Sequence, residues 1–302
     1  MKTRMILLTA ATAAILAGCN NDNEPAAGAD GRTALQVSTT VTRATGSAFV
    51  KDDHIGIYLM NPLQNTVVGT YGNVDYKAND LLKFNPAAAD KTIYLPVDGT
   101  ACYAVAYYPY QANMGAVGTY QIDLSGQDAM TDLTGIDLMV APMVTGLTKD
   151  NATANFTFAH KLNRLQLNLE AGAGLTAEDL AGIKVTLTNR YLSGACDVLT
   201  DGEAVVSVAE TNDVVTNDLP MSVSADGKTA KALQFPMEAD PECKLIFTLA
   251  DGEVFTSSLA TKVFEAGVQD IYTVTVQRTA LGINAIITPW TDQTTPGGIT
   301  AD

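Results

Sequence analysis

Hydrophobic and polar positions alternate in short runs along most of the chain after residue 34, and turn residues separate the runs. Alternation with period two is typical of half-buried strands, and short continuous apolar runs are typical of strands buried on both faces. The first alternating run is Leu35, Val37, Thr39 and Val41. The pattern predicts further strands at 54–60, 92–96, 101–108, 155–160, 164–170, 183–188, 204–209, 232–236, 244–249, 254–259, 271–277 and 282–288.

Asp-Gly pairs between these runs supply the positive-φ residues that tight hairpin turns need; they are Asp98-Gly99, Asp201-Gly202, Asp226-Gly227 and Asp251-Gly252. One segment carries a helical signal, because Thr176-Ala177-Glu178-Asp179 has the form of an N-terminal capping box. It predicts one or two helical turns that connect strands and end by Ile183. The chain is therefore expected to be an all-β sandwich protein.

The length of 302 residues allows two domains of ordinary size. A polar break at Lys149-Asp150-Asn151 separates the first block of strands from the second. Together with the first 32 residues, this break predicts four parts: a signal peptide at 1–18, a flexible tether at 19–32, an N-terminal β-sandwich domain at 33–152 and a C-terminal one at 153–302.

The first residues have the form of a lipoprotein signal. Lys2 and Arg4 precede an apolar run that ends in Leu16-Ala17-Gly18-Cys19, a lipobox in which the Cys19 thiol would accept the acyl chain. The alternative is an ordinary secretory signal that happens to contain Cys19. The polar stretch after Cys19 is rich in Pro and Gly, which predicts a mobile tether, and Asn20 after the cysteine fits an outer-membrane destination.

Composition excludes one class of partner. The net charge is −15, which argues against nucleic acid binding. Three cysteines follow Cys19, at positions 102, 196 and 243, so at most one disulfide can form. We expect three buried, reduced thiols that pack as small hydrophobic groups.

Candidate catalytic groups are sparse. The chain has two histidines, His54 and His160, so no histidine cluster for zinc is expected, and it has no Gly-x-Ser-x-Gly motif. The acidic pairs Asp52-Asp53 and Glu178-Asp179 are expected to serve turns and caps first. We therefore expect no catalytic site, no metal and no cofactor.

Four motifs occur in a characteristic order: Asp52-Asp53-His54-Ile55-Gly56-Ile57-Tyr58, the aromatic run from Tyr103 to Tyr110, the run from Phe156 to Leu165, and Ile287-Thr288-Pro289-Trp290. Together with the lipobox, they resemble the fimbrillin-like family, the Mfa-type and FimA-type subunits of type V pili. The resemblance covers most of the chain after Leu35. It implies two tandem transthyretin-like Greek-key β-sandwich domains, export as an outer-membrane lipoprotein to the cell surface, and incorporation into a pilus.

The resemblance also implies cleavage by an arginine-specific protease and polymerisation with other pilin subunits by strand exchange. Arg43-Ala44 follows the run of Leu35, Val37, Thr39 and Val41, so cutting there would free that strand for displacement, whereas cutting at Arg32 would leave it attached. Without the resemblance, Arg43 would be interpreted as a solvated residue at a strand end.

The candidate donor is the last apolar segment, in which Ile283, Ala285 and Ile287 share a face. It is equally well interpreted as the last strand of its own domain, and a subunit at the pilus tip would need no donor.

Two other functions stay open from the residues. A surface glycan-binding lipoprotein that does not polymerise would share the lipobox and the sandwiches, but it would need exposed aromatic faces such as that of Trp290, the single tryptophan. An enzyme would need a cleft with paired acids. A host or bacterial surface receptor is a further partner that an adhesive subunit would bind.

Overall fold

The computed structural model describes residues 31–41, 49–199, 206–208, 217–238, 242–259, 262–279 and 282–289, and of 206–208, 279 and 282–289 it describes the backbone alone. The regular structure of these residues consists of β-strands and of short 3-10 helices. None of the helices in these ranges is long and apolar enough to cross a membrane. The chain is thus an all-β protein with a sandwich-like architecture, as the pattern predicts.

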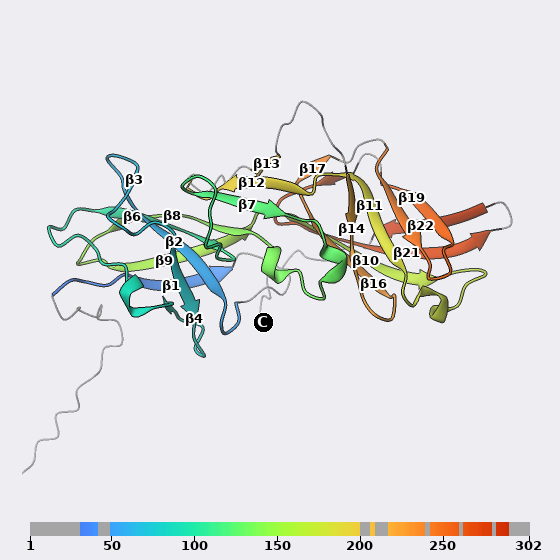
Figure 1. The fold of residues 1–302 in the computed structure, drawn as a ribbon, viewed down its shortest axis with the longest axis horizontal. Coiled ribbons are helices and arrows are strands. Elements are labelled where there is room, and N and C mark those ends of the chain that lie inside the picture. Colours follow the sequence, from blue (N-terminus) through green and yellow to red (C-terminus); the bar gives the residue numbers. More distant parts are fainter. Residues whose placement is uncertain are drawn as a thin grey trace, which may run out of the picture.

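The N-terminal strands form one eight-stranded sheet, which lies at one end of the elongated molecule (Figure 1). Its spatial order is β1 (Gln36–Val41), β9 (Thr153–His160), β8 (Met139–Leu147), β6 (Cys102–Tyr108), β2 (His54–Asn61), β4 (Val74–Ala78) and β5 (Phe84–Pro86), and β3 (Thr66–Val67) pairs with β2. β1 and β9 are parallel, and the other pairs are antiparallel. β1 is therefore an edge strand.

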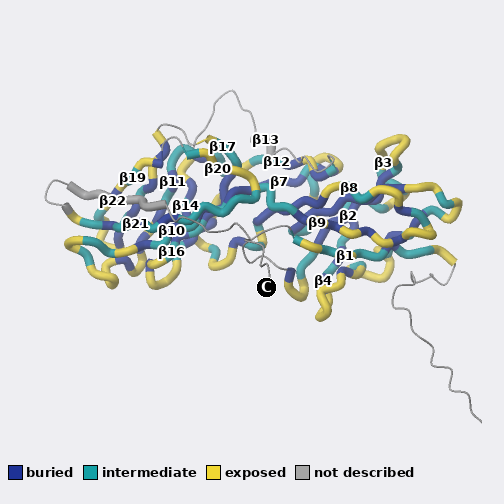
Figure 2. The backbone as a smooth tube through the Cα atoms, turned by 180° about the vertical axis from the view of Figure 1, so that it is seen from behind, coloured by how far each residue is buried: buried dark blue, intermediate teal, exposed yellow. Residues whose placement is uncertain are grey.

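The two central strands of this sheet, β2 and β6, are buried on both faces. Figure 2 shows the buried residues, in dark blue, in the interior of this end of the molecule. Ile55, Ile57 and Ala104 contribute to the N-terminal core. Tyr58 and Val105, which alternate with them, contribute to a second core that extends into the C-terminal half. Because a strand exposes alternate side chains on opposite faces, the same two strands serve both cores.

The C-terminal half packs two sheets around this second core. One sheet has the order β15 (Ser222–Val223), β16 (Thr229–Gln234), β10 (Asn163–Ala171), β21 (Gln269–Thr279) and β22 (Gly282–Pro289). The other has the order β14 (Asn217–Pro220), β11 (Lys184–Arg190), β18 (Lys244–Thr248) and β19 (Val254–Ser258), and β17 (Met237–Glu238) pairs with β20 (Val263–Phe264). Leu167 and Val274 of the first sheet and Phe247 of the second are fully buried in the shared core.

The two halves are joined by a small sheet of β13 (Val206–Val208), β12 (Ser193–Asp197) and β7 (Thr119–Asp123), in which β7 comes from the N-terminal half. The buried Gln127 adds side-chain bonds across the junction. Its amide nitrogen donates to the Leu233 carbonyl at 2.9 Å, and its amide oxygen accepts from the Leu233 N–H at 2.7 Å. The hydroxyl of Ser222 hydrogen-bonds to the Met130 carbonyl.

Four 3-10 turns complete the regular structure: η1 (Ala89–Lys91), η2 (Gln127–Ala129), η3 (Thr134–Ile136) and η4 (Ala177–Leu180). η4 is the predicted connector, and it forms a single turn. The Asp179 carboxylate accepts hydrogen bonds from the Thr176 N–H at 2.7 Å and from the Thr176 hydroxyl at 2.9 Å, so the capping signal is confirmed.

Most of the expected strands are present with ends shifted by a few residues, but the one expected at 92–96 is wrong. That segment makes an isolated bridge between Tyr94 and Ala34 instead of a strand. The alternation of Ile93 and Leu95 with polar residues arises because both side chains are buried in the N-terminal core. Several further strands, among them β4, β7, β8 and β12, were not predicted; β4 and β7 do alternate buried and less buried positions, but each over only five residues.

The polar break at 149–151 forms the turn between β8 and β9, where Thr148 and Asn151 exchange backbone hydrogen bonds. Both strands belong to the large sheet, and sheet membership changes between β9 and β10, that is, between His160 and Asn163. The division into two tandem domains stays a prediction, since β7 and β12 pair across the halves and one apolar core contains residues of both.

Replacing Gly56 by alanine is expected to destabilise the fold by about 2 kcal/mol, the usual cost of overpacking a core. A Cβ at Gly56 would lie 2.2 Å from Cε1 of Tyr107, whose ring is fully buried. Gly135→Ala is the matched control, because Gly135 has open space around its Cβ position, and its effect should stay within about 0.5 kcal/mol. Urea unfolding of both variants measures the difference, and equal stability would show that Tyr107 can move aside.

Alkaline pH is expected to weaken the fold through Tyr76, because burial raises the pKa of its phenol to about 12 from 10.0. A group whose pKa is raised on folding stabilises the native state fully below the unfolded pKa and loses that contribution between the two values. The unfolding free energy should therefore fall between pH 10 and 12.

Tyr76→Phe should flatten this dependence by up to about 1.4 kcal/mol per pH unit. It should also cost about 1 kcal/mol at neutral pH, because the Tyr76 oxygen accepts a hydrogen bond from the Ile93 N–H at 3.2 Å. Denaturant titrations at about pH 8 and about pH 11 test both effects. An unchanged slope in the variant would assign the alkaline loss to other groups.

Candidate functional site

The strand predicted to be displaced, with Leu35, Val37, Thr39 and Val41, is β1 together with the residue before it. Leu35 is buried at 5% exposure, Val37 and Val41 pack half-buried against the N-terminal core, and Thr39 is half-buried as well. The alternating Ser38 and Thr40 are exposed. The apolar face of β1 therefore covers one side of the core, as its period-two pattern predicts.

β1 runs parallel to β9 over six paired positions, from Gln36 opposite Thr153 to Val41 opposite Phe158. β9 supplies Phe156 and Phe158 to the core beneath, both almost fully buried. On the exposed face the hydroxyls of Thr40 and Thr157 lie 3.2 Å apart. Removing β1 would thus expose backbone groups of β9 and an apolar surface at the same time.

The amino end of β1 is bonded on both of its sides. On one side the Gln36 N–H donates to the Ala152 carbonyl at 2.8 Å. On the other, the Leu35 N–H donates to the Ile93 carbonyl at 2.8 Å, and the Leu95 N–H donates to the Thr33 carbonyl at 3.0 Å. Just before this point the guanidinium of Arg32 lies 4.1 Å from the centroid of the Tyr94 ring. The segment at 93–95, although not a strand, closes the sheet against β1.

The chain is described again from Phe49, which is anchored in the same core. The ring of Phe49 makes edge contacts with Phe84, Tyr108 and Phe158, with centroids 5.1, 5.4 and 5.2 Å apart. Asp53 fixes the following turn, because its carboxylate accepts the Val50 N–H at 2.7 Å. The proposed cleavage residues Arg43 and Ala44 therefore lie in sequence between two anchored points, in a segment outside the described residues. Cys19 also lies outside them.

The candidate donor residues Ile283, Ala285 and Ile287 are on β22, which pairs antiparallel with β21 of the same chain. Their register partners are Arg278, Val276 and Val274, respectively. Val274 and Val276 are fully buried. β22 is thus the last strand of its own sheet, at its edge.

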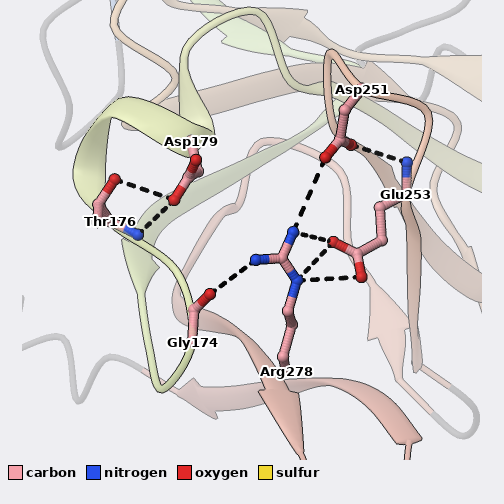
Figure 3. Close-up of polar contacts among 6 residues, drawn as sticks. All are labelled: Gly174, Thr176, Asp179, Asp251, Glu253 and Arg278. Carbon is pink, nitrogen blue, oxygen red and sulfur yellow. Dashed lines mark hydrogen bonds and ion pairs between the residues drawn. The ribbon is translucent and has the colours of Figure 1, made fainter.

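β21 is held independently of β22 at the end where the two strands meet. Figure 3 shows the Arg278 guanidinium between two neighbouring loops. Its Nε donates to the Glu253 carboxylate at 2.8 Å, and its Nη1 donates to the Gly174 carbonyl at 2.8 Å. The hydrogen bond to Glu253 raises the pKa of Arg278. These contacts join the end of β21 to the turn after β18 and to the loop before η4.

The titratable groups that could suggest catalysis have structural partners. His54 Nδ1 lies 2.7 Å from Asp75, and His160 Nδ1 lies 3.0 Å from Asp137, so each histidine faces a carboxylate. Asp52 pairs with Lys77 at 2.8 Å, and the hydrogen bond from this lysine lowers the pKa of Asp52. The described part of the chain contains no group of three or more His, Cys, Asp or Glu residues arranged to hold a metal.

Cys102, Cys196 and Cys243 are buried as reduced thiols, as expected, and burial raises the pKa of Cys196 to about 12. A thiol in this state is a poor nucleophile. The tyrosines of the Tyr103–Tyr110 run are also enclosed: Tyr103, Tyr107 and Tyr108 are buried and Tyr110 is half-buried. They form part of the two cores and offer no exposed aromatic face for a sugar, and Trp290 lies outside the described residues.

Two features of this site were missed in the sequence. Phe49 gives no local signal, because it follows the small residues 44–48 and has only Val50 as an apolar neighbour, without periodicity. The backbone hydrogen bonds between the start of β1 and residues 93–95 could not be predicted, because the apolar alternation at 92–96 has the pattern of another strand. The spacing of Ile93 and Leu95 was the available signal, since it marks a segment with one face on the core.

Comparison with known proteins identifies the family. The sequence profile described as fimbrillin-like matches residues 42–290. A Bacteroides uniformis protein named Fim1C, a candidate fimbrium subunit, is 31% identical to this chain over an alignment of 304 positions. The alignment covers 96% of this chain and 96% of that protein.

Two crystal structures of candidate cell adhesion proteins share the fold. One, from Bacteroides uniformis, has a TM-score of 0.67 and 30% identity over 86% of this chain and 99% of the other. A second, from Bacteroides ovatus, has a TM-score of 0.66 and 25% identity over 87% and 99% of the two chains. The chain therefore belongs to the fimbrillin-like family, a family of structural and adhesive proteins and not of enzymes.

Proposed function

We propose that this chain is a subunit of a cell-surface fimbrium, made as a lipoprotein on Cys19, matured by an arginine-specific protease between Arg43 and Ala44, and assembled by exchange of β1 for a strand of another subunit. The family match and the similarity to a candidate fimbrium subunit support the fimbrial role. The observation that carries the assembly mechanism is the position of β1, an edge strand that covers a hydrophobic core and directly precedes Arg43.

Displacement of β1 would make the subunit adhesive. An edge with unpaired N–H and C=O groups above an apolar surface binds another strand readily. Here the vacated surface would include Phe156 and Phe158 beside the backbone of β9. Leu35 alone would lose about 2 kcal/mol of burial energy, so the opened subunit gains from any extended strand that places apolar side chains at alternate positions.

Cleavage at Arg43 suits this mechanism better than cleavage at Arg32. A cut after Arg32 would leave β1 covalently joined to Phe49 and to the core. Arg32 also stacks on Tyr94, so a protease would have to pull it away from the ring. A cut after Arg43 separates β1 from the body, which Phe49 continues to hold through its three aromatic contacts.

β22 is the proposed donor within this scheme. Being an edge strand, it can leave without dividing its sheet, and Arg278 would keep β21 attached to the neighbouring loops. Ile283, Ala285 and Ile287 then bring apolar groups at the spacing that Leu35, Val37, Thr39 and Val41 occupy on β1. The cost is the exposure of Val274 and Val276, which limits donation to the moment when a partner groove is open.

Cleavage is tested on folded protein without residues 1–18. An arginine-specific protease should produce a new N-terminus at Ala44 and, with time, multimers that resist SDS. Arg43→Lys should block both results, because lysine keeps the charge but is not a substrate, and the matched control Arg32→Lys should leave both unchanged. N-terminal sequencing and unheated SDS gels provide the measurement. Multimers that form equally well from Arg43→Lys would exclude this maturation site.

Donation by β22 is tested by a disulfide that fixes it to β21. Thr273 and Thr288 are register partners, so Thr273→Cys with Thr288→Cys can join the two strands. The oxidised double variant, once cleaved after Arg43, should remain monomeric, and reductant should restore assembly. The single variant Thr288→Cys controls for the substitution itself. Multimers formed with the disulfide intact would show that another segment is the donor. If no multimers form and the protein is instead retained on polysaccharide, a glycan-binding surface protein would be favoured.

A further inference from the structure

The two ends of β1 are attached to the sheet unequally. At its amino end, residues 33–36 hydrogen-bond on one side to Ala152 and on the other to Ile93 and Leu95. Over 37–41, the pairing found in the described residues is with β9 alone. Hydrogen bonds on two sides must break together for a strand to separate, so the amino end opens less readily than the carboxyl end.

Side-chain contacts show the same asymmetry. Leu35 is buried at 5% exposure at the amino end, and Arg32 stacks over Tyr94 one step beyond it. Toward the carboxyl end Val41 is half-buried and Thr40 is exposed, with its hydroxyl beside that of Thr157. Burial of apolar area therefore stabilises the Leu35 end more than the Val41 end.

The proposed cut lies next to the weaker end. Arg43 follows Val41 by two positions, so cleavage frees the carboxyl end of β1. The amino end, which is hydrogen-bonded on both of its sides, still holds the strand in the sheet. The amino end also leads back through residues 19–32 to Cys19. A cleaved subunit would thus remain joined to its lipid by non-covalent bonds to its own β1.

We propose that cleavage and release of β1 are separate steps, and that β1 is displaced in one direction, beginning beside Val41 and Phe158 and ending at Leu35. An incoming strand pairs first with the part of β9 that opens most often and then advances toward residues 93–95. The cleaved subunit stays on the membrane until such a strand arrives. This inference rests on the proposed maturation at Arg43 and specifies its order of events.

The test uses the full chain without residues 1–18, cut after residue 43. If the arginine-specific protease does not cut there, a recognition sequence for another protease, inserted after Arg43, provides the same nick. Failure of the proposed maturation is then distinguished from failure of the proposed order of release. Gel filtration of the nicked protein should show the β1 fragment eluting with the body. Hydrogen exchange should be about tenfold or more faster at Thr40 than at Gln36, because the N–H groups of both residues face β9 and differ in how readily their end of the strand opens.

Two introduced disulfides test from which end β1 opens. Thr40→Cys with Thr157→Cys fixes the carboxyl end, and Gln36→Cys with Thr153→Cys fixes the amino end, each at a pair of register partners. The first should slow exchange along the whole of residues 33–41 by about tenfold. The second should leave exchange at 39–41 within about twofold of the nicked parent. The reduced forms of both variants are the controls.

Loss of the β1 fragment on the first gel filtration would overturn the retention step. Equal exchange along β1, or protection of residues 39–41 by the disulfide at Gln36 and Thr153, would overturn the direction. Either result leaves cleavage at Arg43 and the formation of multimers to be judged by their own experiment.

Discussion

The structure depends on burying β2 and β6 on both faces. These strands contribute one set of side chains, including Ile55 and Ala104, to the N-terminal core, and the alternate set, including Tyr58 and Val105, to the core that continues into the other half. A strand buried on both sides cannot be withdrawn without opening two cores. Gly56 belongs to this arrangement, because the absence of a side chain there makes room for the ring of Tyr107.

Stability is consequently graded from the centre of the large sheet to its edge. β6 has sheet neighbours on both sides and cores on both faces, whereas β1 has one long neighbour, one covered face and one exposed face. This gradient would allow β1 to be exchanged, as proposed, while the rest of the sheet stays intact. The aromatic anchor at Phe49 marks where the rigid part begins on the other side of the proposed cleavage bond.

The all-β class and the position of β1 could be predicted because they depend on local periodicity. For β1, the alternation of Leu35, Val37, Thr39 and Val41 is sufficient without any knowledge of the strands that it contacts. Partners could not be predicted in the same way. The pairing of β9 with β1 and β8 gave no local sign, since the polar turn at 149–151 resembles a boundary as well as a hairpin. The role of Phe49 depends on contacts with Phe84, Tyr108 and Phe158, which are distant in sequence, and a single sequence does not specify such contacts.

The pairing of β1 with β9 also bears on how the chain folds as it is made. Thr40 and Thr157 are separated by 117 positions, so β1 is synthesised long before the strand that binds it. Contacts over so long a separation form late, because a large loop must close first. The edge of the N-terminal sheet at β9 therefore lacks its partner strand until β1 docks. In this order of folding, the chain's own first strand protects the newly formed sheet once it docks, as a built-in chaperone would.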